Sequence, residues 1–287
     1  MSPPAVVTVT HRSGHTLPAL LESLAHHQPG SPVVVVDSAS PEGPPAVPPG
    51  VALVSLTRNV GFGAACNAGA AHPSVADATH LAFLNPDVRL QGPTLDQIVR
   101  GFGPATGIAT GPVVDPRGQP APAAWGPTSP ARAFWYASGL GMVRLRQVVG
   151  RIRATGSGTS GASMVRDRLH VDGHVLGGAM VVARRCFDEI GGFDEGFFLY
   201  WEDADLCWRA RAAGWDVELL PSTPFVHAAG TSSSGTTDDD RRAWYAEGAE
   251  RFAERHLDPR DARRLLRALR LGDAVRQVRP GRGRGRP

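Results

Sequence analysis

Lysine is missing from this chain of 287 residues, so all 30 of its basic side chains are arginines. Asparagine is almost as scarce, since it occurs only at Asn59, Asn67 and Asn85. A bias against both residues is typical of a GC-rich coding sequence and indicates nothing about function. It does make the three asparagines conspicuous, because all of them fall inside one window of 27 residues. We therefore expect this window to line a site.

Cysteine is nearly absent as well. Cys66, Cys186 and Cys207 are odd in number, lie far apart and lack the spacing of metal ligands. This usage excludes a disulfide-stapled scaffold, and we expect three buried thiols in a reducing compartment.

Long apolar runs are missing too. No run approaches the roughly 20 residues that a helix needs to span a bilayer. The first residues enter a strand-like segment at once, without the pattern of a signal peptide. We expect a cytoplasmic protein, either free or peripheral on the inner face of the plasma membrane.

The formal net charge is only +3, but the charges are unevenly distributed. From residue 251 to the end there are twelve arginines against four acids, a charge of +8, which leaves −5 for the rest of the chain. A basic terminus of this kind indicates an anionic partner, either a membrane surface or a nucleic acid.

Within this basic terminus, residues 261–272 follow a helical pattern. Arginines surround one side, and the other side carries Ala262, Leu265, Leu266 and Leu269. Such a helix fits an anionic membrane surface. It fits equally a helix docked on its own domain and followed by a disordered tail. Nucleic acid is disfavoured, because no aromatic residues interleave with the arginines.

Hydrophobic residues make up 42% of the chain, enough for the core of one large α/β domain or two small ones. Short β-branched runs alternate with helical patterns, which predicts a mostly parallel sheet with right-handed crossovers. The predicted strands are 5–10, 32–36, 51–56, 79–84, 107–114, 174–185 and 216–221. The predicted helices are 15–27, a small-residue helix after 59, 97–102, a short helix from 185, 202–213, and a basic helical region from 241. Residues 231–240 are expected to form a polar loop, and 155–162 a flexible one.

Polar residues follow several of the predicted strands. In sheets of this type, ligands bind beyond the carboxyl ends of the strands. Asp37 follows the second strand, Arg58 and Asn59 follow the third, and Asn85 and Asp87 follow the fourth. This arrangement indicates a nucleotide-type site, although the chain has neither a dinucleotide-binding GxGxxG pattern nor a P-loop.

Each of these residues also has an ordinary structural interpretation. Asp37 suits hydrogen bonds to a base or ribose, or an Asx turn. Arg58 suits a phosphate, or plain solvent exposure. Asp87 suits a divalent cation held on a diphosphate, or a simple Asn-Pro turn. His227 becomes a metal ligand only if the fold returns it to Asp87.

The most conspicuous motif is the stretch 191–215. It begins with a glycine-aromatic loop, continues through Glu202, Asp203 and Asp205, and enters an amphipathic helix that should end at Gly214. Acids are common in the first turn of a helix, so helix stabilisation is the ordinary interpretation. The neighbouring aromatics favour a catalytic one, because apolar rings raise carboxyl pKa values toward those of a general base.

Taken in order, six segments resemble the family 2 glycosyltransferases and, within them, the bacterial rhamnosyltransferase-like group. The segments are VVTVTHRSG, VVVVDSAS, RNVGFGAACNAG, FLNPDV, GGAMVVARRCFDEIGGFDEGFFLYWEDADLCWRARAAGW and PFVHAAGTSS. FLNPDV stands where the family has its Asp-x-Asp motif. The resemblance covers about residues 5–115 and 172–233, and the shared order of six weak motifs makes it specific.

The resemblance implies a single GT-A-type α/β domain with a mostly parallel, Rossmann-like sheet flanked by helices. It assigns this domain to residues 1–240, with a nucleotide-sugar-binding half (1–115), a variable insertion (116–171) and an acceptor and catalytic half (172–240). A basic helical C-terminal extension with a disordered tail would occupy 241–287.

The implied activity is inverting transfer of a sugar, a deoxyhexose such as L-rhamnose, to a hydroxyl of a glycan or lipid-linked acceptor. The donor would be a nucleotide sugar, with dTDP favoured, and the product a cell-envelope polysaccharide or a natural-product glycan. By resemblance, Asp203 is the general base, and Glu202 supports it or orients the acceptor. Asp205 keeps the ordinary interpretation of a first-turn helix acid. Asp87 and His227 would hold a divalent cation, Mg²⁺ or Mn²⁺, on the departing diphosphate.

The same resemblance implies further contacts. Nucleotide-sugar binding falls to residues at the strand ends and at the helix that follows the third strand, namely Thr10, Asp37, Arg58, Asn59, Gly61, Asn67, Asn85 and Asp87. Acceptor binding falls to Tyr200 and Trp201. A nucleic acid is not expected as a partner.

Two departures from the family pattern bear on this assignment. Arg12 stands where many relatives have asparagine, and the Asp-x-Asp motif keeps a single carboxylate, Asp87. A non-catalytic nucleotide-sugar-binding homologue is therefore an alternative, against which the Glu202–Asp203 pair argues. A sugar-phosphate nucleotidyltransferase would share the sheet, but the glycine-rich Arg/Lys signature expected near its N-terminus is missing.

Overall fold

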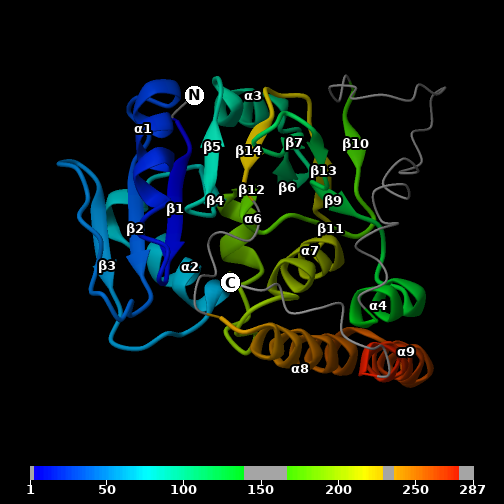
Figure 1. The fold of residues 1–287 in the computed structure, drawn as a ribbon. Coiled ribbons are helices and arrows are strands. Elements are labelled where there is room, and N and C mark those ends of the chain that lie inside the picture. The colour runs from blue at the N-terminus through cyan, green and yellow to red at the C-terminus, as the bar shows by residue number, and fades with distance from the viewer. Residues whose placement is uncertain (1–2, 139–166, 229–235, 278–287) are drawn as a thin grey trace.

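An eight-stranded sheet runs through the molecule in the order β10-β13-β6-β12-β4-β1-β2-β3 (Figure 1). The computed structural model describes residues 3–138, 167–228 and 236–277. The strands of the sheet are β1 (Ala5–Thr10), β2 (Val33–Asp37), β3 (Ala52–Ser55), β4 (His80–Leu84), β6 (Thr106–Thr110), β10 (Leu169–His170), β12 (Ala179–Ala183) and β13 (Asp216–Leu219).

The sheet is mostly parallel, as the sequence predicts. β1 pairs in parallel with β2 and β4, β2 with β3, and β6 with β13. Only β12, inserted between β4 and β6, and the short edge strand β10 run antiparallel. The carboxyl ends of β1, β2 and β4 therefore meet at one edge, where a ligand would bind.

Helices cover both faces of the sheet and extend beyond one edge. They are α1 (Leu17–His27), α2 (Phe62–Ala70), the 3₁₀ turn η1 (Pro73–Val75), α3 (Thr94–Gly101), α4 (Pro130–Ala137), α6 (Arg184–Glu189), α7 (Glu202–Ala212), α8 (Asp238–His256) and α9 (Pro259–Gln277). The small residues of α2 let it lie close to the sheet. A Cβ at Gly69 would come within 2.5 Å of a Val7 methyl carbon and 2.9 Å of one of Val36.

A second sheet pairs a strand from the end of the domain with strands from its first half. Its order is β5-β14-β7-β8, with β5 at Val88–Leu90, β14 at Phe225–His227, β7 at Val113–Val114 and β8 at Pro120–Ala121. Within it β14 pairs antiparallel with β5, so that His227 lies opposite Val88. This pairing brings His227 beside Asp87, which the sequence could not show.

Three predicted elements have different limits in the structure. The strand predicted over 107–114 is divided into β6 and β7, because Pro112 interrupts the run and the two parts join different sheets. The strand predicted over 174–185 is divided by Gly177 and Gly178 into β11 (His174–Val175), which pairs with β9 (Ala124–Trp125), and β12.

The third difference concerns the polar loop predicted over 231–240. It ends earlier, because α8 begins at Asp238. Thr237 and Asp240 form a capping box, in which the Thr237 hydroxyl accepts from the Asp240 N–H at 3.1 Å. The flexible loop predicted at 155–162 and the predicted disordered tail, GRGRGRP (281–287), lie outside the described residues.

The C-terminal helices pack onto α7 and α4 around a second apolar cluster. Its fully or nearly buried members include Trp201, Phe252, Leu265 and Leu269. The apolar face of the basic helix therefore docks on its own domain, which was one of the two predicted alternatives. The three cysteines are free and buried, as expected. None of the described helices is long and apolar enough to span a membrane.

A buried ionic contact links α7 to α8. Asp205 is fully buried and accepts from Arg209 Nε at 2.8 Å, while His256 Nε2 lies 2.6 Å from its other oxygen. Arg209 also donates to the carbonyls of Ile190 and Gly192. Asp205 lies in the first turn of α7, as expected. Its carboxylate has a second role that the sequence did not indicate, because it joins two helices and a turn.

Replacing His256 with alanine should lower the free energy of unfolding by about 2–3 kcal/mol, because a buried carboxylate loses one of its two partners. The substitution also removes the stack of His256 on Trp208, whose ring centroids lie 4.1 Å apart. Urea unfolding of His256→Ala measures the loss. The exposed His15→Ala variant is the matched control, and an equal effect of both variants would contradict the structural role.

Candidate active site

Tight turns follow β1 and β2 at the carboxyl ends of these strands, where the sequence predicts nucleotide binding. Asp37 ends β2, is almost fully buried, and accepts from the Ser40 N–H at 3.2 and 3.3 Å. The Asx-type turn expected as its ordinary role is therefore present. Thr10, at the end of β1, is buried with its hydroxyl 3.0 Å from that of Ser13. Arg12 has a φ of 57°, a left-handed conformation that is uncommon outside glycine.

The loop before α2 is tied to the same edge. Asn59 accepts from the Ser38 hydroxyl and from the Gly61 N–H, both at 3.1 Å. Gly61 has a φ of 87°, and a Cβ there would collide with the carbonyl of Phe198. Glycine is therefore required where this loop meets the stretch that leads to α7. Arg58 lies exposed on the loop.

Asn67 is engaged inside the protein. Its carboxamide donates to the carbonyl of Phe193 at 2.9 Å and accepts from the Phe193 N–H at 2.9 Å. It also donates to Glu195 at 3.1 Å. Contact of Asn67 with a nucleotide sugar stays a prediction. The observed hydrogen bonds hold the glycine-aromatic loop against α2.

Asp87 and His227 lie together, as the metal hypothesis requires. Asp87 Oδ1 is 3.2 Å from His227 Nε2, and their side chains are 0% and 10% exposed. The buried Nε2 makes no hydrogen bond of good geometry among the described residues. One carboxylate oxygen and one imidazole nitrogen fit a divalent cation that takes its remaining ligands from a diphosphate and water. The residues present therefore fit the expected group.

Two adjacent glycines, Gly177 and Gly178, bring the segment around Asn85 and Asp87 close to the acids of α7. A Cβ at Gly178 would collide with the Asn85 carboxamide, and a Cβ at Gly177 would lie 3.0 Å from the Asp203 Cβ. The Gly177 N–H donates to Asp203 Oδ2 at 3.2 Å. Asn85 and Asp203 thus approach the same turn, so the structure brings the donor side and the proposed base together.

The two acids at the start of α7 have different surroundings. Burial, and after it the charge of Asp203, raises the pKa of Glu202 to about 8. Asp203 is only half-buried, and its carboxylate accepts from the N–H groups of Ala204, at 2.8 Å, and Gly177. Near neutral pH, Glu202 is therefore mainly protonated. Asp203 is the more exposed acid of the pair and the one that a ligand can reach from the cavity.

The backbone just before these acids is strained. Tyr200 and Trp201 have φ values of 71° and 72°. Such conformations cost about 1–3 kcal/mol each and persist only where the surroundings impose them. Trp201 packs between Tyr245 and Phe252 of α8, with ring centroids 5.3 and 5.2 Å away. The C-terminal extension therefore fixes the entry into α7.

A cavity of about 660 Å³ opens beside Asp203 and Glu202. Its walls come from α4, α8, α9 and the β9–β11 pair. The predicted acceptor residues Tyr200 and Trp201 line it. So do residues that the sequence did not reveal, among them Trp125, Arg132, Trp135, His174, Arg241, Arg242, Tyr245 and Arg276. All of these but His174 lie in the insertion and the C-terminal extension, where no motif marks them.

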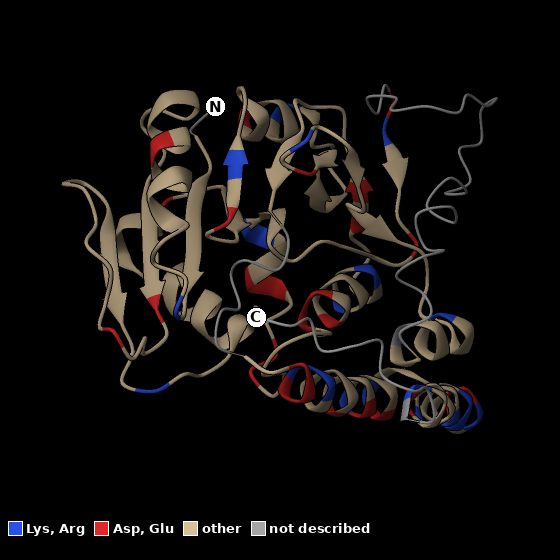
Figure 2. Cartoon of the chain, in the orientation of Figure 1, with Lys and Arg blue, Asp and Glu red and all other residues tan. Residues whose placement is uncertain are grey.

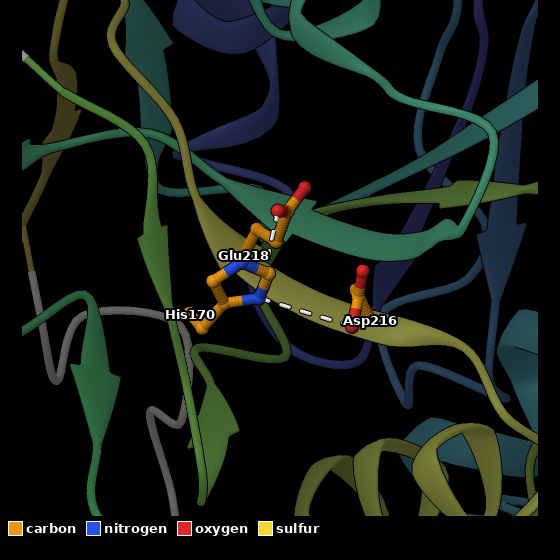
Figure 3. Close-up of side chains that lie close together, drawn as sticks. All are labelled: His170, Asp216 and Glu218. Carbon is orange, nitrogen blue, oxygen red and sulfur yellow. Dashed lines mark ion pairs between the residues drawn. The ribbon is translucent and has the colours of Figure 1, made fainter.

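A separate group of possible metal ligands lies at the far edge of the sheet (Figure 3). His170 Nδ1 is 3.8 Å from Asp216 and 3.7 Å from Glu218. Arg168 already neutralises Glu218, at 2.6 and 2.8 Å from its two oxygens, and the Thr106 hydroxyl donates to it at 2.6 Å. A cation here would compete with the guanidinium of Arg168. In addition, β10 and β13 lie at one edge of the sheet, whereas β1 and β2 lie toward the other edge. Asp87 pairs with an imidazole, which can itself bind a metal, whereas Glu218 already pairs with a guanidinium. The Asp87–His227 pair therefore fits a cation better than this group does.

Comparison with known proteins agrees with this geometry. Residues 5–147 match the family described as Glycosyl transferase family 2, and residues 161–229 match the N-terminal domain of galactosyltransferase. The chain is 32% identical over 245 residues to the N-acetylglucosaminyl-diphospho-decaprenol L-rhamnosyltransferase of Mycobacterium tuberculosis, covering 77% of this chain and 75% of the relative. It is 40% identical over 53 residues to the rhamnosyltransferase WbbL of Escherichia coli K12, or 18% of this chain and 20% of that protein.

The fold also has a solved counterpart. The mannosyltransferase PcManGT of Pyrobaculum calidifontis, in complex with GDP-Man and Mn²⁺, aligns with a TM-score of 0.52 at 16% identity, over 96% of this chain and 74% of that one. This similarity bears on the fold alone, which is of the expected GT-A type. Membership of the family decides against a nucleotidyltransferase. The chain belongs to the family 2 glycosyltransferases, in their rhamnosyltransferase-like group.

Proposed function

We propose that this glycosyltransferase moves an L-rhamnosyl group, with inversion, from a dTDP-linked donor to a hydroxyl of a lipid-linked saccharide in cell-envelope synthesis. The observation that carries the proposal is the position of Asp203, a hydrogen-bonded carboxylate at the junction of the donor edge and the large cavity. The sugar and the lipid-linked acceptor follow the printed activity of the mycobacterial relative. Such an enzyme works in the cytoplasm at the inner face of the membrane.

In the proposed reaction, Asp203 removes the proton of the acceptor hydroxyl as the oxygen attacks the anomeric carbon. The bond from that carbon to the diphosphate breaks on the opposite face, so the configuration inverts. Protonated Glu202 cannot compete for the proton, and it is available to donate a hydrogen bond to the acceptor or to Asp203.

On the departing side, Asp87 and His227 would hold a divalent cation, which would supply positive charge to the leaving diphosphate. Asp37 and Thr10 face the nucleoside from the ends of β2 and β1, and Arg58 reaches a phosphate from its exposed loop. Asn59 and Gly61 shape this loop. Asn85, which packs against Gly178, also contacts the nucleotide sugar.

The lining of the cavity supports an acceptor that carries a diphosphate. Arg132, Arg241, Arg242 and Arg276 all face it, and guanidinium groups bind phosphate oxygens in a planar, bidentate manner. Arg241 pairs with Asp238 and Arg242 with Asp239, both exposed acids of their own helix. The aromatic residues of the same cavity, including Tyr200 and Trp201, suit a sugar ring.

The activity is tested with dTDP-L-rhamnose and an N-acetylglucosaminyl-diphospho-lipid, each with Mn²⁺ or Mg²⁺. We expect release of dTDP together with a product heavier by one deoxyhexose, measured by mass spectrometry. Other nucleotide sugars serve as controls for donor choice. Donor binding without dTDP release, for every acceptor in a panel, would instead identify a non-catalytic homologue.

Replacing Asp203 with asparagine should lower kcat by about 10²–10⁴-fold, because the amide cannot accept the proton. The fold should be retained, since the amide oxygen can still accept from the Gly177 N–H. Initial rates and thermal unfolding measure the two effects. Asp188→Asn, at an exposed position of α6, is the matched control. Wild-type turnover by a folded Asp203→Asn variant would refute the assignment of the base.

Glu202 predicts a pH dependence of stability. Its pKa is raised from an ordinary 4.5 to about 8, because burial disfavours the charged form. Between pH 4.5 and about 8, the folded state therefore keeps a proton that the unfolded state loses. In this pH range the free energy of unfolding should fall by up to roughly 1.4 kcal/mol per pH unit. Glu202→Gln should remove this contribution, so its stability relative to wild type should rise with pH. Denaturation from pH 5 to 8.5 measures it, with the exposed Glu22→Gln as the control.

The metal assignment predicts which histidine matters. Mn²⁺ should strengthen dTDP binding to wild type, and a hundredfold excess of ligand over its Kd stabilises the fold by about 2.7 kcal/mol. His227→Ala and Asp87→Ala should lose the Mn²⁺-dependent part of this shift. His170→Ala, which removes one member of the His170, Asp216 and Glu218 group, should keep the Mn²⁺-dependent part of the shift. The reverse result, seen by thermal shift or calorimetry, would place the cation at the far edge of the sheet.

A further inference from the structure

The outward face of α9 is a strongly basic surface. Leu265, Leu269 and Gly272 face the protein, and the opposite side presents Arg260, Arg263, Arg264, Arg267 and Arg270, all exposed. Figure 2 shows the blue of arginine on α9 at the lower edge of the molecule. The helix carries six arginines against two aspartates, a formal charge of +4.

Little of this charge is neutralised. Arg264 pairs with Asp261 at 3.1 Å and Arg270 with Glu250 at 4.0 Å, but the two arginine side chains stay 71% and 78% exposed. Exposed pairs of this kind contribute little free energy and break readily. For Arg260, Arg263 and Arg267, the described part of the chain offers no ion pair. The surface is therefore available to an anionic partner.

Apolar side chains accompany the arginines. Only three large hydrophobic residues are exposed in the described part of the chain, and two of them, Leu271 and Trp135, lie on α9 and α4. Leu271 follows Arg264 by seven residues and so shares its helical face. The two helices touch closely, since a Cβ at Gly272 would lie 2.6 Å from the Phe134 carbonyl.

The basic surface adjoins the active site. Leu269, Asp273 and Arg276 on the inner side of α9 line the same cavity as Asp203. Trp135 lines it too, while remaining 41% exposed. A partner bound to the outer face of α9 would therefore lie next to the cavity.

We propose that the outward face of α9, with Leu271 and Trp135, docks the protein on an anionic phospholipid bilayer. A bilayer offers both anionic headgroups for the arginines and an interfacial layer for leucine and tryptophan. Each basic residue at such a surface strengthens partitioning by about fivefold. A nucleic acid would use the arginines but gives Leu271 no partner. Docking here presents the cavity to lipid-linked molecules at the membrane.

The experiment measures co-sedimentation of the full chain with vesicles of phosphatidylcholine, with and without phosphatidylglycerol. We expect pelleting only with the anionic lipid, and its loss at high salt. Arg263→Glu with Arg267→Glu should lower partitioning by at least about tenfold. The matched control, Arg100→Glu with Arg117→Glu, makes the same change of charge at exposed positions, with Arg100 on α3 at the opposite end of the molecule from α9 (Figure 1). It should bind the vesicles like wild type.

Leu271→Ser provides a second variant that leaves the charge unchanged, and it should weaken partitioning by several-fold. Thermal unfolding shows that each variant is folded. Equal loss in the control pair, undiminished binding of the α9 pair, or pelleting with neutral lipid would overturn the proposal. So would tight binding of single-stranded RNA without binding of anionic vesicles. No donor or acceptor is present, so the outcome is independent of the proposed sugar transfer.

Discussion

The buried carboxylate of Asp205 connects the parts of the protein that must agree in position. Through Arg209 it reaches the carbonyls of the glycine turn before α7, and through His256 it reaches the end of α8. A charge without water around it is tolerated only when such partners surround it. The direction of α7, and with it Glu202 and Asp203, is therefore coupled to the C-terminal helices. Those helices form much of the cavity wall.

Close backbone approach is the second constraint. At Gly61, the loop before α2 touches the carbonyl of Phe198, and at Gly177 and Gly178, the turn before β12 touches Asp203 and Asn85. A side chain at these positions would separate the elements. The donor edge and the acids of α7 can meet only because these three positions carry no Cβ. Glycine here determines the geometry of the site, not the flexibility of the chain.

Neighbouring acids acquire different properties from their surroundings. Glu202 is buried beside Asp203, so it holds its proton, whereas Asp203 faces the cavity and two N–H donors. One helix start thus places a buried acid beside one that a ligand can reach. The aromatic context in the sequence indicated a perturbed carboxyl group, and the raised pKa is that of Glu202, because burial disfavours its charged form.

The sequence by itself determined the first half of the sheet, the helix that begins at Glu202, and the family. These features depend on β-branched runs, helical spacing and short motifs, which are local. Only the tertiary structure decided that His227 returns to Asp87, that Gly107 and Val114 belong to strands of different sheets, and that arginines of α4, α8 and α9 line one cavity. The physical reason is that periodicity records which face of an element is buried, but not the element that covers it. Contacts between distant segments depend on complementary shape and charge, which no local pattern contains.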